Sequence, residues 1–326
     1  MPVIRRRLLQ APFAGAAVLL LPQPASAQAY PTRPVRVIVP VAPGGANDTT
    51  ARLVAQGLSE QLGQQFYVEN QVGAGANIGM GFAARAPADG YTVLAAGGNF
   101  VINPSLYAKV PYDPQKDFAP VSLLCSSPHV LAVHPSVPAA TVNEFIALAK
   151  ANPGKFSYAS AGRGTPAHLG GELFKLAFGL DITHVPFGGG GPGITATIGN
   201  HVPVSVAALP TAIAYIRGGN VRALAMMSAK RTSLLPDVPT MAEATGTNLE
   251  ADIVTGFVVP TGTPHEIVDR LYRAVTVVMA QPAFRDRLAA LGFEAVGSTP
   301  DNFAEWINVE LAKWAKVIRD AHITLQ

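Results

Sequence analysis

Three glycine-rich segments have the residue types that hold small anions through the protein backbone. They are residues 40–48, 160–168 and 186–192, and each lies between an expected strand and an expected helix. The first N–H groups of a helix have no partner within the helix, and the helix dipole adds partial positive charge at that end. Such an end holds a carboxylate or phosphate without a charged side chain. Each segment alone is equally compatible with an ordinary strand-to-helix turn.

Local signals in the first two segments favour helix starts. Gly44 and Gly45 permit backbone conformations closed to other residues, and Asp48 is a candidate N-cap of the next helix. In the second segment, Thr165 stands where an N-cap is expected and Pro166 where the first helical residue is expected. The sequence therefore predicts two helices whose N-termini are available to a ligand.

Two further residues of the second segment allow alternative interpretations. Arg163 is either a turn residue that faces solvent or a clamp on a second acidic group of the ligand. His168, one turn into the expected helix, either packs in support of the loop or contacts the ligand. The sequence leaves both choices open.

Patterns typical of catalysis, metal binding or nucleotide binding are absent from the sequence. The glycines at 73, 75 and 79 have one residue too many for a dinucleotide fingerprint, and no phosphate-binding P-loop is present. Residues 265–269 lack the second histidine of a zincin helix, and the seven histidines show no metal-ligand spacing. Cys125 lies in an apolar strand, which favours a buried thiol over a nucleophile. We therefore expect no enzyme, no metal and no cofactor.

Short apolar strands alternate with amphipathic helices along the chain, and this repetition predicts an α/β protein with parallel strands. The last expected helix, 300–321, has an apolar stripe at helical spacing that predicts core packing. Besides the strand before residue 186 and the helix that begins near Pro192, the expected strands are 35–39, 66–70, 91–95, 121–124, 130–133, 156–159, 202–207, 221–226 and 255–259. The expected helices are 49–62, 73–86, 142–151, 166–178, a segment ending at 217, 264–280, 282–291 and 300–321.

The order of these elements predicts two lobes with chain crossings near 124–130 and 252–256. The first lobe comprises residues 31–126 plus 254–326, and the second comprises 127–253. Small-molecule sites favour domain interfaces and the carboxyl ends of strands, so the cleft between the lobes is the expected ligand site.

Residues 1–27 have the features of a secretory signal peptide. Arg5, Arg6 and Arg7 precede an apolar stretch at 8–21, and 25–27 reads Ala-Ser-Ala, a small-residue cleavage site. The arginines before a leucine pair faintly resemble a twin-arginine signal, so the export route stays open. We expect cleavage and a mature protein in the periplasm.

Removal of this segment changes the charge of the chain. The chain has 24 Lys and Arg against 21 Asp and Glu, and the segment holds three of the arginines and no acid, which leaves 21 of each. With no basic cluster remaining, nucleic acid binding loses its electrostatic support. With 49% hydrophobic residues and low net charge, the chain has the composition of a folded protein.

The motifs together resemble the Bug family, the solute-binding receptors of tripartite tricarboxylate transporters. The resemblance covers essentially all of the mature chain. In the first lobe it is carried by Pro43-Gly44-Gly45-x-x-Asp48, by Asn77-Ile78-Gly79 and by Asp89-Gly90-Tyr91-Thr92. In the second lobe it is carried by Tyr158-Ala159-Ser160-x-Gly162-x-Gly164-Thr165-x-x-His168, by His184-Val185-Pro186-Phe187 and by Leu235-Pro236-Asp237-Val238-Pro239-Thr240.

The resemblance implies a two-lobed periplasmic binding protein, similar to type II, with a central sheet in each lobe and a hinged cleft. It implies a monomer without a cofactor that captures a small carboxylate, such as an amino acid, a di- or tricarboxylate or an aromatic acid, for integral membrane permease subunits. A receptor for a signalling partner, or an exported hydrolase, is the alternative. Together with Arg163, the residues expected to bind the ligand are Ala42, Gly44, Gly45, Asp48, Asn99, Ala161, Gly162, Gly164, Thr165, His168, Phe187 and Gly188.

The chain departs from the family pattern at several positions expected to face the cleft. Gly193 and Ala196 stand where the family often has Ala and Asp, and Pro203 stands where an Asp is usual. The pair 207–208 is Ala-Ala in place of an acidic or amide residue, and 254–255 is Val-Thr in place of an aromatic residue. The identity of the carboxylate therefore does not follow from the resemblance.

Overall fold

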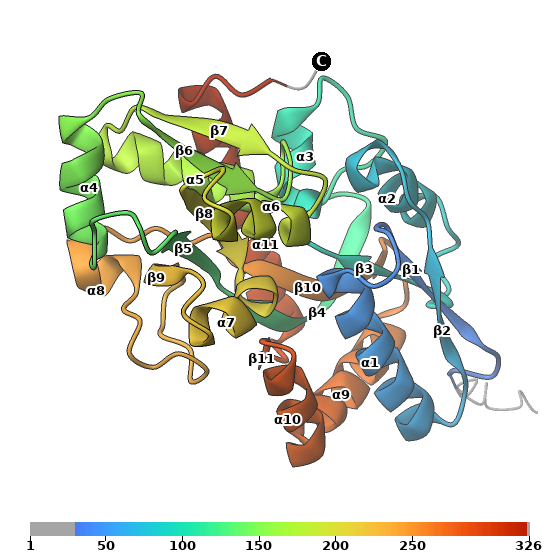
Figure 1. Ribbon diagram of the computed structural model, residues 1–326. Coiled ribbons are helices and arrows are strands. Elements are labelled where there is room, and N and C mark those ends of the chain that lie inside the picture. The colour runs from blue at the N-terminus through green and yellow to red at the C-terminus, as the bar shows by residue number, and fades with distance from the viewer. Residues whose placement is uncertain (1–29, 325–326) are drawn as a thin grey trace, which may run out of the picture.

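The computed structural model describes residues 30–324 and shows two sheets joined by two chain crossings (Figure 1). The signal-peptide prediction at 1–27 lies outside the described residues. Within 30–324, no helix has the length and apolar character needed to cross a membrane.

The first sheet has six strands in the order β11-β4-β10-β3-β1-β2, and the second has five in the order β7-β6-β8-β5-β9. In chain order the strands of the first sheet are β1 (Val35–Val39), β2 (Phe66–Asn70), β3 (Thr92–Ala96), β4 (Phe118–Ser127), β10 (Ile253–Pro260) and β11 (Glu294–Ala295). Those of the second are β5 (His129–Val133), β6 (Phe156–Ser160), β7 (Ile182–Pro186), β8 (Val204–Ala208) and β9 (Arg222–Met227).

Eleven α-helices and one 3₁₀ turn are found among the described residues, and most of the helices follow a strand. Those nearest the first sheet in sequence are α1 (Ala46–Leu62), η1 (Ala74–Ala76), α2 (Asn77–Ala84), α3 (Asn99–Leu106), α9 (His265–Ala280), α10 (Pro282–Ala290) and α11 (Pro300–Asp320). Those within the second-sheet segment are α4 (Val142–Ala151), α5 (Pro166–Phe178), α6 (Gly190–Ile198), α7 (Leu209–Arg217) and α8 (Met241–Thr245).

Both sheets are mixed, where the sequence pattern predicted parallel strands. The pairs β1–β2, β1–β3, β6–β7 and β6–β8 are parallel, as strand-helix repetition requires. The strand β10 runs antiparallel to β3 and β4, and β5 runs antiparallel to β8 and β9. These exceptions arise because β4 leads into the second sheet and β10 returns from it alongside β4.

The two crossings lie side by side. Ser127, the last residue of β4, pairs with Ile253, the first residue of β10, while β5 begins at His129. The strands therefore change sheets close to the positions expected from sequence. The limits of the lobes themselves stay a prediction.

The long helix α11 packs against the first sheet and also reaches the second-sheet segment. It contacts α3, β4 and α5, and Phe303, Ile307 and Trp314 of its apolar stripe are buried. A methyl group at Gly256 of β10 would come 2.2 Å from the Phe303 ring, so only glycine allows this close approach. The predicted core stripe is thus confirmed.

Candidate ligand-binding site

A cavity of about 730 Å³ is lined by residues of both sheet segments. Residues 40–47 and 97–99 contribute from the first segment, and residues 159–161, 165–167 and 188–190 contribute from the second. The volume lies within the range of roughly 300–1,000 Å³ usual for small-molecule sites. The cavity therefore occupies the place expected for a ligand cleft.

The first residues of five helices line this cavity. The lining residues at or next to these starts are Ala46 and Asn47 of α1, Asn99 of α3, Pro166 and Ala167 of α5, Gly190 of α6, and Ala208 beside α7. The starts of α1, α3 and α5 approach one another closely. A methyl group at Gly98 would lie 2.7 Å from Pro166 Cγ, and one at Gly97 would lie 2.7 Å from Asn47 Nδ2.

The loop before α1 is shaped by Asp48, which does not cap the helix as the sequence suggested. Gly45 is the N-cap, and Asp48 is buried in the first turn. Its carboxylate accepts hydrogen bonds from Gly44 N at 2.9 Å, Arg52 Nε at 2.9 Å and Asn70 Nδ2 at 2.8 Å. Burial by itself would raise the pKa of Asp48, but these hydrogen bonds outweigh it and hold the pKa below its ordinary value. Asp48 thus holds Gly44, whose φ of +83° favours glycine, in its turn.

The loop before α5 has the helix start that the sequence predicted. Thr165 is the N-cap and its hydroxyl accepts from His168 N, and Pro166 follows at the first helical position. The Thr165 hydroxyl also donates to Gly162 O at 2.7 Å. This cap leaves Ala167 N without an intrahelical partner beside the cavity.

Two stacked histidines support this loop from behind. The ring centroids of His168 and His184 lie 4.0 Å apart. His168 Nδ1 accepts from Gly164 N at 3.1 Å, and His184 Nε2 pairs with Ser160 Oγ at 2.7 Å. Burial is the main cause that lowers the pKa of His168 to about 4 and that of His184 to about 3, so both rings are neutral at neutral pH. His168 thus bonds to its own loop, and a contact with the ligand stays a prediction.

The structure brings seven of the thirteen predicted site residues to the cavity wall. They are Ala42, Gly44, Gly45, Asn99, Ala161, Thr165 and Gly188. The other six do not line it: Asp48, Gly162, Arg163, Gly164, His168 and Phe187. Whether the seven contact a ligand stays a prediction.

Arg163 is exposed and lines a separate hollow of about 300 Å³. That hollow also takes in His168, Glu172 and Lys175. The geometry therefore does not support the alternative in which Arg163 clamps a second acidic group of a ligand in the cavity.

The cavity wall carries no Asp, Glu, Lys or Arg side chain among the described residues. Its one titratable ring, His129, is buried, and burial lowers its pKa to about 4. Of the seven positions that depart from the family pattern, four belong to the wall, namely Gly193, Ala207, Ala208 and Val254. Backbone N–H groups and a few neutral side chains are thus the polar groups available to a ligand.

Sequence reasoning missed several polar residues of the wall, namely Asn47, His129, Ser160, Ser205 and Thr211. Asn47 stands inside a loop already singled out and could have been added. Ser205 interrupts an apolar strand and His129 follows Pro128 at a crossing, but neither position indicates a cavity before the fold is known. Asn47 Oδ1 and Ser205 Oγ are buried and have no hydrogen-bond partner among residues 30–324.

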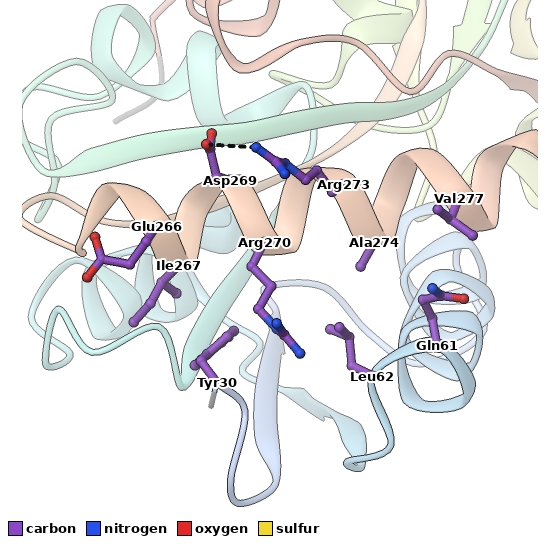
Figure 2. A pocket seen from close by; sticks show the side chains of 10 residues that line it. All are labelled: Tyr30, Gln61, Leu62, Glu266, Ile267, Asp269, Arg270, Arg273, Ala274 and Val277. Carbon is purple, nitrogen blue, oxygen red and sulfur yellow. Dashed lines mark ion pairs between the residues drawn. The ribbon is translucent and has the colours of Figure 1, made fainter. Parts of the chain in front are cut away.

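A groove on the outer surface, between α1 and α9, has a different character (Figure 2). Arg270 points into it between Tyr30 and Leu62, and Asp269 pairs with Arg273 at 3.7 Å. It is lined by none of the predicted site residues. Cys125 is fully buried in β4, as predicted, and burial raises the pKa of its thiol to about 12.

Comparison with known proteins decides the family. Residues 50–323 match the model of the tripartite tricarboxylate transporter family receptor. The chain belongs to this family. It is 36% identical to the protein BugT of Bordetella pertussis over 305 residues, which cover 93% of this chain and 94% of BugT. Family membership makes it a solute-binding receptor and not an enzyme, as the sequence analysis expected.

Solved structures agree with the fold. One described as a periplasmic transporter is 40% identical, with a TM-score of 0.80, and covers 91% of this chain and 100% of its own. Rpa4515 of R. palustris, solved with adipate, is 34% identical with a TM-score of 0.80, covering 90% of this chain and 99% of its own. The two-sheet periplasmic binding protein fold is thereby confirmed.

Proposed function

We propose that this receptor binds a small carboxylate in the cavity between the lobes 31–126 plus 254–326 and 127–253. The observation that carries the proposal is the meeting of helix starts from both sheet segments at a wall without charged side chains. Each helix start contributes roughly half a positive charge. An anion is the ligand that such a wall attracts.

The starts of α1, α3 and α5 are the proposed carboxylate site. Gly45 and Ala46 of α1, with Ala167 of α5, present backbone N–H groups that no intrahelical acceptor uses. The Asn99 amide on the same wall adds a neutral hydrogen-bond donor, whereas the Thr165 hydroxyl already donates to Gly162 O and holds the α5 start in place. A relative solved with adipate, a small carboxylate, supports this ligand class.

The two crossings at Ser127–His129 and Ala251–Ile253 are the proposed hinge. Rotation about them would close the α1 and α3 starts onto the α5 and α6 starts and present both lobes to a partner. We propose that the protein works in the periplasm after cleavage at 27 and delivers its ligand to integral membrane permease subunits.

Thermal unfolding with acids and their amides tests the proposal. A bound acid at 100 times its dissociation constant should stabilise the protein by roughly 2.7 kcal/mol. The uncharged amide of equal size should give a smaller shift, because the helix starts attract the negative charge. Equal shifts with acid and amide, or a shift only with sugars or metal ions, would refute the proposal.

A further inference from the structure

Ser205 is a buried polar group on the cavity wall that nothing in the protein satisfies. It lies in β8 with 1% of its surface exposed, and its Oγ has no hydrogen-bond partner within residues 30–324. A buried hydroxyl without a partner costs folding free energy. Because Ser205 also lines the cavity, a ligand is the partner in position to satisfy it.

The residues paired with Ser205 in the sheet are small and apolar. Ser205 pairs with Ala159 of β6 and Ala132 of β5. Helix α6 packs on β6 and β8, and its Gly193 and Ile194 line the same cavity. A methyl group at Gly193 would come 3.3 Å from Ser160 O and 3.8 Å from Ala159 Cβ, so glycine lets α6 pack closely on β6 here.

A carboxylate would be poorly satisfied at Ser205. A carboxylate offers about four lone-pair sites, whereas one hydroxyl supplies one donor. The N–H of Gly193 is not free, because it donates to Gly189 O. A hydroxyl group of the ligand needs only one or two hydrogen-bond partners. The Ser205 hydroxyl can be one of them, either as donor or as acceptor.

His129, which lines the same cavity, also favours a neutral group of the ligand over a second carboxylate. Its Nδ1 bonds to Ala251 O, and because a carbonyl oxygen only accepts, Nδ1 carries the proton. The ring is neutral, since burial lowers its pKa to about 4. The remaining nitrogen, Nε2, is therefore an acceptor, which repels a carboxylate and favours an O–H or N–H group.

We infer that Ser205 recognises a neutral hydrogen-bonding group of the ligand, so that the receptor selects monocarboxylates bearing a hydroxyl over dicarboxylates of equal length. The inference rests on the proposed function, since the helix starts hold the single carboxylate. Ser205 is then a specificity-determining residue that contacts the ligand.

Calorimetry with three matched ligand series tests the inference. The series are straight-chain monocarboxylates, their ω-hydroxy derivatives and the α,ω-dicarboxylates. Members with the same number of chain carbons are compared with one another, across several chain lengths. The hydroxy acid should bind roughly two- to tenfold more tightly than the plain acid, the range of one net hydrogen bond. In Ser205→Ala this ratio should fall to about one, with the affinity for the plain acid retained. Ser233→Ala, at an exposed serine outside the cavity wall, should keep the ratio.

The outcomes separate the inference from the proposed function. Tightest binding by the dicarboxylate at every length, or an unchanged ratio in Ser205→Ala, overturns the inference and leaves carboxylate binding intact. Equal affinity of the wild-type protein for plain and hydroxy acids likewise overturns the inference and leaves carboxylate binding intact. Binding by no member of the three series overturns both.

Discussion

Replacing Asp48 with asparagine tests whether the first loop is held in place by this side chain. Asp48 was expected from sequence to bind the ligand, but the structure turns its carboxylate toward Gly44, Arg52 and Asn70. The two roles predict opposite effects on affinity. A carboxylate in contact with an anionic ligand repels it, so its removal would tighten binding. A carboxylate that positions the loop supports binding, so its removal weakens it.

The magnitude follows from the three hydrogen bonds. A hydrogen bond to a charged group contributes roughly 1.5–3 kcal/mol and a neutral one roughly 0.5–1.5, so loss of the charge costs about 1 kcal/mol for each bond. Asp48→Asn should therefore destabilise the protein by about 3 kcal/mol. Without the Asp48 carboxylate, Gly44 is free to leave its turn and must be ordered again when the ligand binds. This costs about 1–2 kcal/mol of binding free energy, which weakens affinity roughly tenfold.

Thermal unfolding and calorimetry with a binding acid measure both effects. Asp269→Asn is the matched control, because that side chain is 39% exposed and forms only long ion pairs, so it should change stability by less than about 1 kcal/mol. The folded pKa of Asp48 lies below its ordinary value of 3.8. Its contribution is therefore complete above that value and is lost as the pH falls through the folded pKa, so the gap between wild type and variant should close in acid. Tighter binding by Asp48→Asn, or an unchanged unfolding temperature, would refute the positioning role.

The second loop gives three further predictions. Thr165→Ala should destabilise the protein by about 1 kcal/mol through loss of the helix cap and weaken acid binding; calorimetry showing full affinity would count against the α5 start as a binding site. Arg163→Ala should leave the affinities for mono- and dicarboxylates unchanged within about twofold, the size of a weak exposed charge effect, and a selective loss of dicarboxylate binding would restore the clamp. Because burial lowers the folded pKa values of His168 and His184 to about 4 and about 3 from 6.5, their stabilising contribution is complete above pH 6.5 and is lost as the pH falls. Unfolding temperature should therefore drop over this range, less steeply in a variant with glutamine at both positions; equal slopes would contradict the neutral stack.

The sequence correctly predicted those elements that form through contacts between residues close together in the chain. Thr165 and Pro166 gave the start of α5 because a cap needs only the residues of the first turn. Asp48 is not the cap because α1 begins earlier, at Ala46, and its carboxylate instead accepts a hydrogen bond from Asn70 of the next strand. Helix α3 was not predicted, and it contains Pro104, a residue type that usually interrupts a helix. It begins directly after β3, and its buried Asn103 donates to Gly75 O and Asn77 Oδ1.

The composition of the cavity depends on contacts between distant segments. Family motifs pointed to the three loops, and six of the site residues predicted there reach the wall, as does Asn99 after β3. Arg163 was the most prominent charge of the loops, but it lines a separate hollow together with Glu172 and Lys175. Ser205 has the pattern of an ordinary strand residue, and only the packing of α6 over β8 reveals its unpartnered hydroxyl.

A crystal structure of the protein with a bound monocarboxylate tests the central claim most directly. We predict that the carboxylate oxygens accept hydrogen bonds from backbone N–H groups at the starts of α1 and α5, within the cavity that both segments line. A carboxylate held instead by a charged side chain, whether Arg163 in its separate hollow or Arg270 in the outer groove, would contradict the account.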